Sequence, residues 1–413
     1  MNLNRNEEII LEKIKKNPYI SQQALAKEVS LSRPAVANII SRLIRKNYLL
    51  GRAYLVNESS PIICIGGANI DNWYQLSASF QSNTTNPTTT VQQPGGVARN
   101  IAENLGRLEQ DVELLSIVGE DSEWQKIEKA SKSFMGVKNV ESLSNSTTGK
   151  YIEIKDEKNR TKAKLSEDTI YEKMSIEWLI KHKTVVKKAE TIIVDLNCPK
   201  ETIEYLQRTV QNEKPLLIVS VSNDKAEHLP ENLSGTHLFI AAEDIVPLEE
   251  TTGQTTFDLQ KAGQRYLEKG AESVVIFQNY QKVLVVQKGK QAILSEFKNS
   301  LLSAPYLSGV KEAFYAGIVY SHSKKETVAE NLKTGYLNAF HTAYSKENVR
   351  TELTKSQLIK EAAELAEDTT ILTLLLEEEK LAEINNLSFY KPPTKEKQHG
   401  NQTNFKELVK WKK

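Results

Sequence analysis

Hydrophobic residues recur at helical spacing in three successive segments of residues 1–58. The apolar positions are Ile9, Ile10, Leu11 and Ile14, then Leu25, Ala26 and Val29, then Val36, Ile39, Ile40, Leu43 and Ile44. Ser21 and Ser32 stand where the N-caps of the second and third helices are expected. Residues 48–56 predict two short strands around a glycine turn. We therefore expect a small domain of three helices and a hairpin over residues 1–58.

From residue 61 the pattern changes to short apolar runs that alternate with amphipathic segments. The apolar runs cover residues 62–65, 112–118, 191–196, 215–221, 237–241 and 273–276. The amphipathic segments cover residues 97–108, 200–211, 257–269 and 311–322. This alternation predicts an α/β domain over residues 61–350, with a mainly parallel sheet covered by helices on both faces. Such domains bind ligands at the carboxyl ends of their strands, and the polar stretch 80–93 predicts an exposed loop or the edge of a lid.

Residues 351–413 form a third region. Apolar residues keep helical spacing over 358–366 and 369–384, and the second of these segments also contains three consecutive glutamates. We expect a C-terminal pair of packed helices with a solvated acidic face; a contact with a partner or a second copy is the alternative. Residues 389–413, with two adjacent prolines and a lysine-rich end, are expected to pack poorly.

Charge is distributed unevenly over these regions. The whole chain has a formal net charge of +1, whereas residues 1–52 contain ten basic and four acidic side chains and so carry +6. The remainder of the chain therefore carries −5. A basic segment joined to a mildly acidic body indicates a module that binds a polyanion, on a carrier that does not.

Composition narrows the setting of the protein. Of the 413 residues, 39% are hydrophobic and 26% are charged, which is typical of soluble globular chains. No apolar stretch is long enough to span a bilayer, and the start of the chain lacks an apolar signal core, so we expect a cytoplasmic protein with no membrane partner. Cys64 and Cys198 are the two cysteines. No His/Cys cluster accompanies them, which argues against a disulfide framework or a structural zinc site.

The basic module has the pattern of a winged helix-turn-helix. Its third helix is narrow enough for the major groove of double-stranded DNA, and side chains near its start would reach base edges. The expected DNA-binding residues are Arg33, Asn38, Arg42 and Arg45 on that helix and Arg52 in the wing. The alternative is that these charges only solvate a small helical bundle. The full order of helix, helix, short turn, capped helix and hairpin favours DNA binding.

A series of motifs follows in order along the body. They are Gly66-Gly67-Ala68-Asn69-Ile70-Asp71, Asn86-Pro87-Thr88, the run PGGVARNIAENL at 94–105, Gly119-Glu120-Asp121, Thr148-Gly149 and Glu167-Asp168-Thr169-Ile170-Tyr171. Over residues 61–350 the chain resembles the ribokinase-like (PfkB) carbohydrate kinase family, and within it the pseudouridine kinases, some of which carry a similar winged helix. The resemblance implies a ribokinase-like α/β fold that binds a sugar or nucleoside. It implies ATP and Mg²⁺ only if the chain is an active kinase.

The residues on the sugar side of this resemblance are kept. In the resembled family the aspartate at the position of Asp71 binds the sugar, and a carboxylate there can accept hydrogen bonds from two adjacent hydroxyls. Glycines beside it allow the backbone to approach the sugar closely. The expected substrate-binding residues are Asn69, Asp71, Gly95, Gly96, Asn100 and Thr148. Taken alone, Asp71 would be interpreted as an ordinary turn carboxylate, and Arg99 is expected to be a solvated helix charge.

The residues on the phosphate side depart from the family pattern. The family stretch D-T-x-G-A-G-D-A-F places an anion hole and a catalytic base at the start of a helix. Here Gly309 survives, Lys311 replaces the second glycine, and Glu312 stands at the position of the base. The longer carboxylate is displaced by roughly 1 Å, which can cost about 10²-fold in rate. If the second glycine needs a positive φ, Lys311 forces a different loop; alternatively, its charge binds phosphate.

Further family motifs are missing on the same side. Residues 244–247 stand where the family has N-x-x-E, and residues 277–282 stand where it has T-x-G-x-x-G. Several losses on the nucleotide half, with the sugar half kept, suggest a relaxed demand for ATP chemistry.

Two functions stay open at this point. The first is a transcriptional regulator that senses a nucleoside or pentose, has weak or lost phosphotransferase activity, binds no metal, and acts as a homodimer because paired half-sites suit a small reading module. The second is an active ATP-dependent kinase for pseudouridine or a similar nucleoside, with Glu312 as base and Lys311 on phosphate, regulated by its winged helix. A plainer interpretation makes the N-terminal bundle an oligomerisation module. The losses on the phosphate side favour the first.

Overall fold

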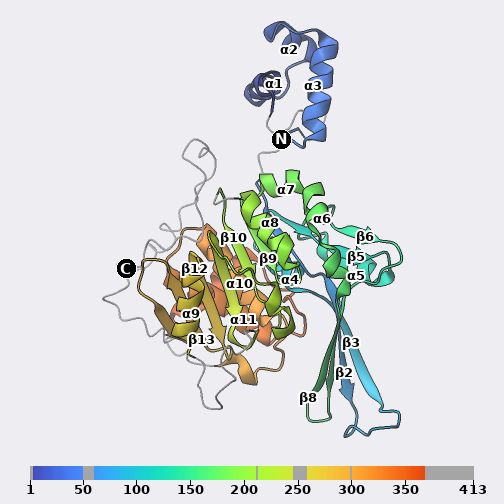
Figure 1. Ribbon diagram of the computed structural model, residues 1–413, viewed down its shortest axis with the longest axis vertical. Coiled ribbons are helices and arrows are strands. Elements are labelled where there is room, and N and C mark those ends of the chain that lie inside the picture. Colours follow the sequence, from blue (N-terminus) through green and yellow to red (C-terminus); the bar gives the residue numbers. More distant parts are fainter. Residues whose placement is uncertain (1–2, 50–59, 211–212, 245–257, 298–299, 368–413) are drawn as a thin grey trace.

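The chain is divided into a small helical domain, a larger α/β body and a narrow sheet that projects from the body. The computed structural model describes residues 3–49, 60–210, 213–244, 258–297 and 300–367. The helical domain and the projecting sheet lie at opposite ends of the body (Figure 1). Most of the predicted hairpin, including Arg52, lies outside the described residues.

Three helices make up the N-terminal domain. They are α1 (Arg5–Lys16), α2 (Gln22–Glu28) and α3 (Arg33–Arg45). The predicted N-caps are confirmed, because the hydroxyl oxygens of Ser21 and Ser32 accept hydrogen bonds from backbone amides three residues later, at 3.1 and 3.3 Å. Helix α1 begins at a capping box formed by Asn4 and Glu7, which the apolar pattern does not reveal. The apolar faces of the three helices form a core of their own.

The body is built on an eight-stranded sheet. In spatial order its strands are β14 (Ile293–Glu296), β13 (Lys282–Gln287), β12 (Ser273–Gln278), β11 (Thr236–Ala241), β10 (Leu216–Val219), β9 (Thr191–Asp195), β1 (Ile62–Ile65) and β4 (Val112–Leu115). The six strands from β12 to β4 pair in parallel, whereas β13 and β14 are antiparallel. The mainly parallel sheet predicted from the sequence is confirmed, and the two antiparallel strands at one edge are additional.

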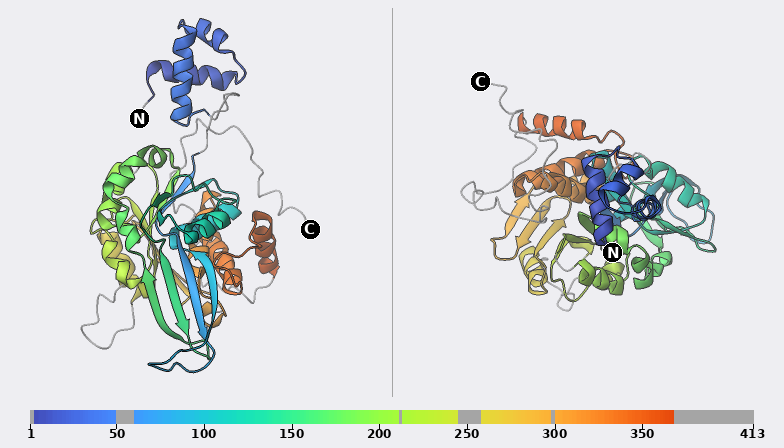
Figure 2. Two further views of the ribbon diagram at one scale, coloured as in Figure 1. Left: turned by 90° about the vertical axis from the view of Figure 1, so that its right-hand side faces the viewer. Right: turned by 90° about the horizontal axis from the view of Figure 1, so that it is seen from above.

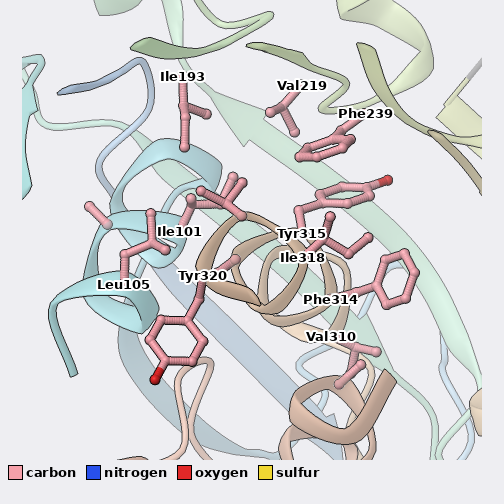
Figure 3. Close-up of a cluster of buried hydrophobic side chains, with 14 of the residues drawn as sticks. Ile101, Leu105, Ile193, Val219, Phe239, Val310, Phe314, Tyr315, Ile318 and Tyr320 are labelled. Carbon is pink, nitrogen blue, oxygen red and sulfur yellow. The ribbon is translucent and has the colours of Figure 1, made fainter. Parts of the chain in front are cut away.

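Helices cover both faces of this sheet (Figure 2). On one face lie α4 (Val97–Arg107), α10 (Val310–Ser323) and α11 (Val328–Ala343), with α12 (Lys355–Glu367) packed on α11. On the other face lie α6 (Ile176–Lys181), α7 (Lys183–Lys188), α8 (Lys200–Val210) and α9 (Leu259–Glu268). Figure 3 shows the core of the first face, where Tyr315 of α10 points toward Phe239 of the sheet and α4 contributes Ile101 and Leu105. Phe239 of β11 stacks on Tyr315 with ring centroids 5.1 Å apart.

The projecting sheet has four strands and is called the lid below. Their order is β3 (Thr88–Gly95), β2 (Asn69–Leu76), β7 (Lys150–Lys155) and β8 (Thr161–Glu167). Helix α5 (Ser122–Ser131) packs against β2 and β3, and the short pair β5 (Ile117–Gly119) and β6 (Glu141–Leu143) lies beside it. The polar stretch 80–93 is therefore a connection followed by an edge strand of the lid. Its many threonines fit such a strand, because β-branched residues favour extended backbone.

The end of the described chain is anchored to the body by a buried ion pair. Arg350 is fully buried, and its guanidinium donates to both carboxylate oxygens of Glu361 on α12, at 2.7 and 2.8 Å. The segment 358–366 is helical as predicted, whereas 369–384 and 389–413 lie outside the described residues. In the described part of the chain, no helix is long and apolar enough to cross a membrane.

Candidate functional site

The loop that follows β1 carries a glycine pair and is held by a buried aspartate of the neighbouring strand. Asp195, fully buried at the end of β9, accepts hydrogen bonds from the amides of Gly67 and Ala98 at 2.9 and 2.8 Å. A side chain at Gly66 would overlap this carboxylate. Burial raises the pKa of Asp195, and the bonds from the amides lower it. Asp195 therefore joins this loop to the start of α4. In the sequence, Asp195 is marked only by its position as an acidic residue at the end of an apolar run.

Asp71 lies near the start of β2, between the side-chain amides of two asparagines. Its carboxylate is 6% exposed and accepts hydrogen bonds from Asn69 Nδ2 at 2.6 Å and from Asn348 Nδ2 at 2.7 Å. Gly95 of β3 pairs with Asn69, and a side chain at Gly95 would overlap the Asp71 carboxylate. Burial raises the pKa of Asp71 to about 7, while the bond from Asn348 lowers it and the charge of Glu312 raises it. Asn348 was missed in the sequence because the family motifs do not reach it.

The glycine before α4 allows a close approach between two loops. Gly96 has a φ of 100°, and a side chain there would overlap the carbonyl of Gly67. Asn100 lies in the first turn of α4, and its Oδ1 accepts a hydrogen bond from Arg99 at 2.9 Å. The expectation for Arg99 was wrong: this residue is 3% exposed and forms an ion pair with Glu103. The ion pair with Glu103 offsets the cost of burying the Arg99 charge. Arg99 therefore lies inside the protein, where its hydrogen bond orients the side chain of Asn100.

Thr148 lies at the base of the lid, before β7. Its hydroxyl donates to Asp121 Oδ1 at 2.6 Å and accepts from the Gly119 amide at 3.0 Å. The side chain is fully buried. Thr148 therefore fixes the loop that contains Gly119 and Asp121, and a contact of its hydroxyl with a ligand would have to replace one of these bonds.

Lys311 lies in the first turn of α10, and its side chain forms an ion pair on the phosphate side of the site. The residue before the helix, Gly309, has a φ of 77° and is the N-cap. Lys311 itself is helical and the positive φ falls on Gly309, which is kept, so the condition under which Lys311 would force a different loop is not met. The Lys311 ammonium donates to Asp244 Oδ1 and Oδ2 at 2.9 and 2.8 Å. Burial favours the neutral amine, yet the Asp244 carboxylate holds the pKa of Lys311 above its ordinary value.

Glu312 stands beside Lys311 at the start of α10 and is 8% exposed. Burial raises its pKa, whereas the charge of Lys311 lowers it. Asn279 stands at the first glycine of the family pattern, in the turn between β12 and β13; it has a φ of 50°, and the next residue, Tyr280, has a φ of 51°. Burial raises the pKa of Tyr280 to about 12, and its ring packs edge-on against Phe277 at 5.8 Å. The described phosphate side thus contains an internal ion pair at Lys311, where the family pattern has a glycine, and an aromatic side chain in the turn after β12.

Within residues 3–49, the expected DNA-binding side chains differ in exposure and in their contacts. Arg33, Asn38 and Arg45 are exposed on α3. Arg42 instead donates from Nε to Glu7 Oε1 at 3.1 Å, and its side chain is 42% exposed. Glu7 is almost fully buried and keeps a low pKa through bonds from Lys46, the Asn4 backbone and Arg42. Arg42 therefore supports the packing of α1 on α3 as well as facing outward.

The fold and the site define a carbohydrate-kinase-like body joined to a DNA-binding module. Residues 60–304 match the pfkB family carbohydrate kinases, and residues 3–49 match a winged helix-turn-helix DNA-binding domain. The chain therefore belongs to the pfkB carbohydrate kinase family and carries an N-terminal winged helix-turn-helix domain.

Two proteins of Escherichia coli (strain K12) are similar in sequence. The uncharacterized sugar kinase YeiI is 26% identical over 324 residues, which cover 77% of this chain and 88% of that protein. A pseudouridine kinase is 27% identical over 183 residues, which cover 44% of this chain and 58% of that protein.

Solved structures share the fold at low identity. A carbohydrate kinase from Agrobacterium tumefaciens superposes with a TM-score of 0.60 at 20% identity, covering 74% of this chain and 97% of the other. The Arabidopsis thaliana ribokinase complexed with ribose and ATP superposes with a TM-score of 0.59 at 15% identity. The superposition covers 74% of this chain and 99% of the ribokinase. The ribokinase-like fold predicted from the motifs is confirmed.

Proposed function

We propose that this protein is a DNA-binding transcriptional regulator whose kinase-like domain senses a nucleoside or pentose, and whose phosphotransferase activity is weak or lost. The ligand would be held by the carboxylate of Asp71 and the amides around it. Similarity to a pseudouridine kinase suggests a pseudouridine-like nucleoside as the first ligand to test.

The observation that carries this proposal is the ion pair between Lys311 and Asp244. The start of α10 is where backbone amides and the helix dipole would meet phosphate oxygens. The Lys311 ammonium already bonds to both carboxylate oxygens of Asp244, so the positive group at this place is satisfied within the chain. The described residues fit a nucleotide with its metal ion poorly, and we assign no transfer step to them.

The second candidate function is an active nucleoside kinase. It is favoured by Glu312, because a buried carboxylate with a raised pKa at the start of α10 suits a general base near neutral pH. In that case Lys311 would exchange Asp244 for phosphate.

Regulation requires that the ligand bind differently to the DNA-bound and free states of the protein. We expect a homodimer in which two winged helices read paired half-sites. Such a protein works where the DNA is, in agreement with the cytoplasmic location expected from the sequence.

The test is DNA binding by the full chain, measured by fluorescence anisotropy with and without pseudouridine or ribose. In a regulator, Asp71→Ala keeps DNA binding but loses the response to the ligand, while Glu312→Ala keeps both. In a kinase, Glu312→Ala removes a measurable turnover of nucleoside and ATP. A ligand that binds without changing DNA affinity would contradict the regulatory function.

A further inference from the structure

The body carries a run of lysines on the pair of helices nearest to the winged helix. Residues 181–188 read KHKTVVKK and contain no acidic residue. They form the end of α6 and the whole of α7, which Figures 1 and 2 place at the end of the body that faces the helical domain. This local charge contrasts with the mildly acidic balance of the body as a whole.

The last lysine of the run joins the body to the end of the recognition helix. Lys188 Nζ donates to the backbone carbonyl of Asn47 at 2.8 Å and lies 4.6 Å from the centre of the Tyr48 ring. Asn47 and Tyr48 directly follow α3. Helix α7 therefore abuts the carboxyl end of the helix whose exposed side bears Arg45.

Two other lysines of α7 are left free for a partner. Lys183 and Lys187 are exposed, and neither forms an ion pair within the described residues. They are four residues apart and so lie on one side of the helix, where like charges destabilise it slightly. The end of α7 is held in place by Lys214, whose ammonium donates to three of its carbonyls, those of Val186, Lys187 and Ala189.

The charges around this helix crowd one another. Lys188 is half-buried, and its burial and the charge of Lys138 hold its pKa below the ordinary value. Burial also lowers the pKa of Lys214; the charge of Glu213 opposes this shift, and the smaller effect of Lys187 adds to it. A polyanion that lies across the surface would relieve this repulsion.

We propose that Lys183 and Lys187 form a second DNA contact, which binds the phosphate backbone beside the segment read by α3. The proposal rests on the DNA-binding function proposed above. It assigns to the kinase-like body a direct share in holding DNA, in place of the purely passive role expected from its net charge. Contacts of this kind add affinity and orient the body without reading sequence.

The experiment compares the full chain with the double variant Lys183→Gln/Lys187→Gln. The matched control is Lys158→Gln/Lys290→Gln, which removes two exposed lysines from the lid turn and from the β13–β14 turn. DNA affinity is measured by anisotropy at several salt concentrations, on a duplex of about 30 base pairs and on one of about 12 base pairs, which leaves few phosphates beyond the winged helix.

We expect the α7 variant to lower the slope of log K against log salt by about 1.8 on the long duplex, since each lost phosphate contact contributes about 0.9. The control should keep the slope of the unaltered chain, and the short duplex should show little difference among the three proteins. Equal slopes for the α7 variant and the control would overturn the second contact while leaving DNA binding by the winged helix intact. Failure of the unaltered chain to bind any duplex would overturn both proposals.

Discussion

The two halves of the site in the kinase-like body use charge in opposite ways. On the sugar side, the Asp71 carboxylate is surrounded by amide donors, and glycines keep space around it. On the phosphate side, the Lys311 ammonium meets a carboxylate of the same chain. A binding site needs polar groups that a ligand can satisfy, whereas groups that satisfy one another leave less for a ligand to gain. Under the proposed function, one half of a catalytic fold is kept for recognition while the other half becomes structural.

The largest expected effect is on ligand binding by Asp71→Ala. Hydrogen bonds to a charged group contribute about 1.5–3 kcal/mol each, so losing two should weaken binding by more than about 100-fold. Calorimetry with pseudouridine or ribose measures this. The matched control is Asp111→Ala, which removes an exposed carboxylate just before β4 and should leave the dissociation constant unchanged. Equal affinities for the two variants would place the ligand elsewhere.

A smaller effect is expected on stability when the ion pair on the phosphate side is broken. Lys311→Met leaves the buried Asp244 carboxylate with the Ser220 hydroxyl, at 2.8 Å, as a remaining side-chain partner among the described residues, and should cost about 3 kcal/mol in the free energy of unfolding. The double variant Lys311→Met/Asp244→Leu should recover most of this loss, because both charges are gone. Urea unfolding of the two variants measures the difference. Equal stability of Lys311→Met and Lys311→Met/Asp244→Leu would mean that the ion pair contributes nothing to the free energy of unfolding.

The affinity for the ligand should depend on pH through Asp71. Its pKa of about 7 is raised by burial, and the acceptor form is the ionised one. Affinity should therefore be constant above pH 7 and fall by about tenfold for each unit below it. The same shift makes the ligand-free protein bind more protons than its unfolded chain between the ordinary pKa of an aspartate and 7, so its stability should decline as the pH rises through that range. Calorimetry from pH 5.5 to 8 gives the profile, and a flat one would contradict an ionised acceptor.

The smallest effect separates two arginines of the winged helix. Arg45→Ala should lower the salt slope of DNA binding by about 0.9, with no change in melting temperature, because its side chain is exposed. Arg42→Ala should lower both the salt slope and the melting temperature, because Arg42 also pairs with the buried Glu7. Salt titrations by anisotropy and thermal melts by circular dichroism supply the two measurements. A melting temperature of Arg42→Ala equal to that of Arg45→Ala would show that the pair with Glu7 adds no stability.

Apolar periodicity and motif spacing were enough to predict much of the fold. The parallel strands, the helices α4, α8, α9 and α10, and the capped helices of the N-terminal domain agree with the pattern. Helix α11 was missed, because it is buried on most of its surface and carries Gly335, Asn331 and Asn338 among its buried residues, so it lacks a clear polar face. The strand β3 was partly missed because its polar threonines resemble those of a loop.

The site was predictable where a local motif carries it and not where distant segments meet. Asp71 and Gly95 belong to motifs that lie close together in the sequence and in space. Asn348 reaches Asp71 from 277 residues away, and Asp195 reaches Gly67 from 128 residues away, so no local pattern announces either contact. The bond between Lys311 and Asp244 joins residues 67 positions apart, so the sequence pattern does not reveal this ion pair either.

The most direct test of the central claim is calorimetry of the pure full-length protein. ATP with Mg²⁺ is titrated into the protein in the absence and in the presence of pseudouridine, and pseudouridine is titrated alone. We predict clear heat for the nucleoside and none for ATP under either condition. Tight binding of ATP would contradict the claim, because Lys311 and Glu312 would then form a working nucleotide site and the protein would be a kinase.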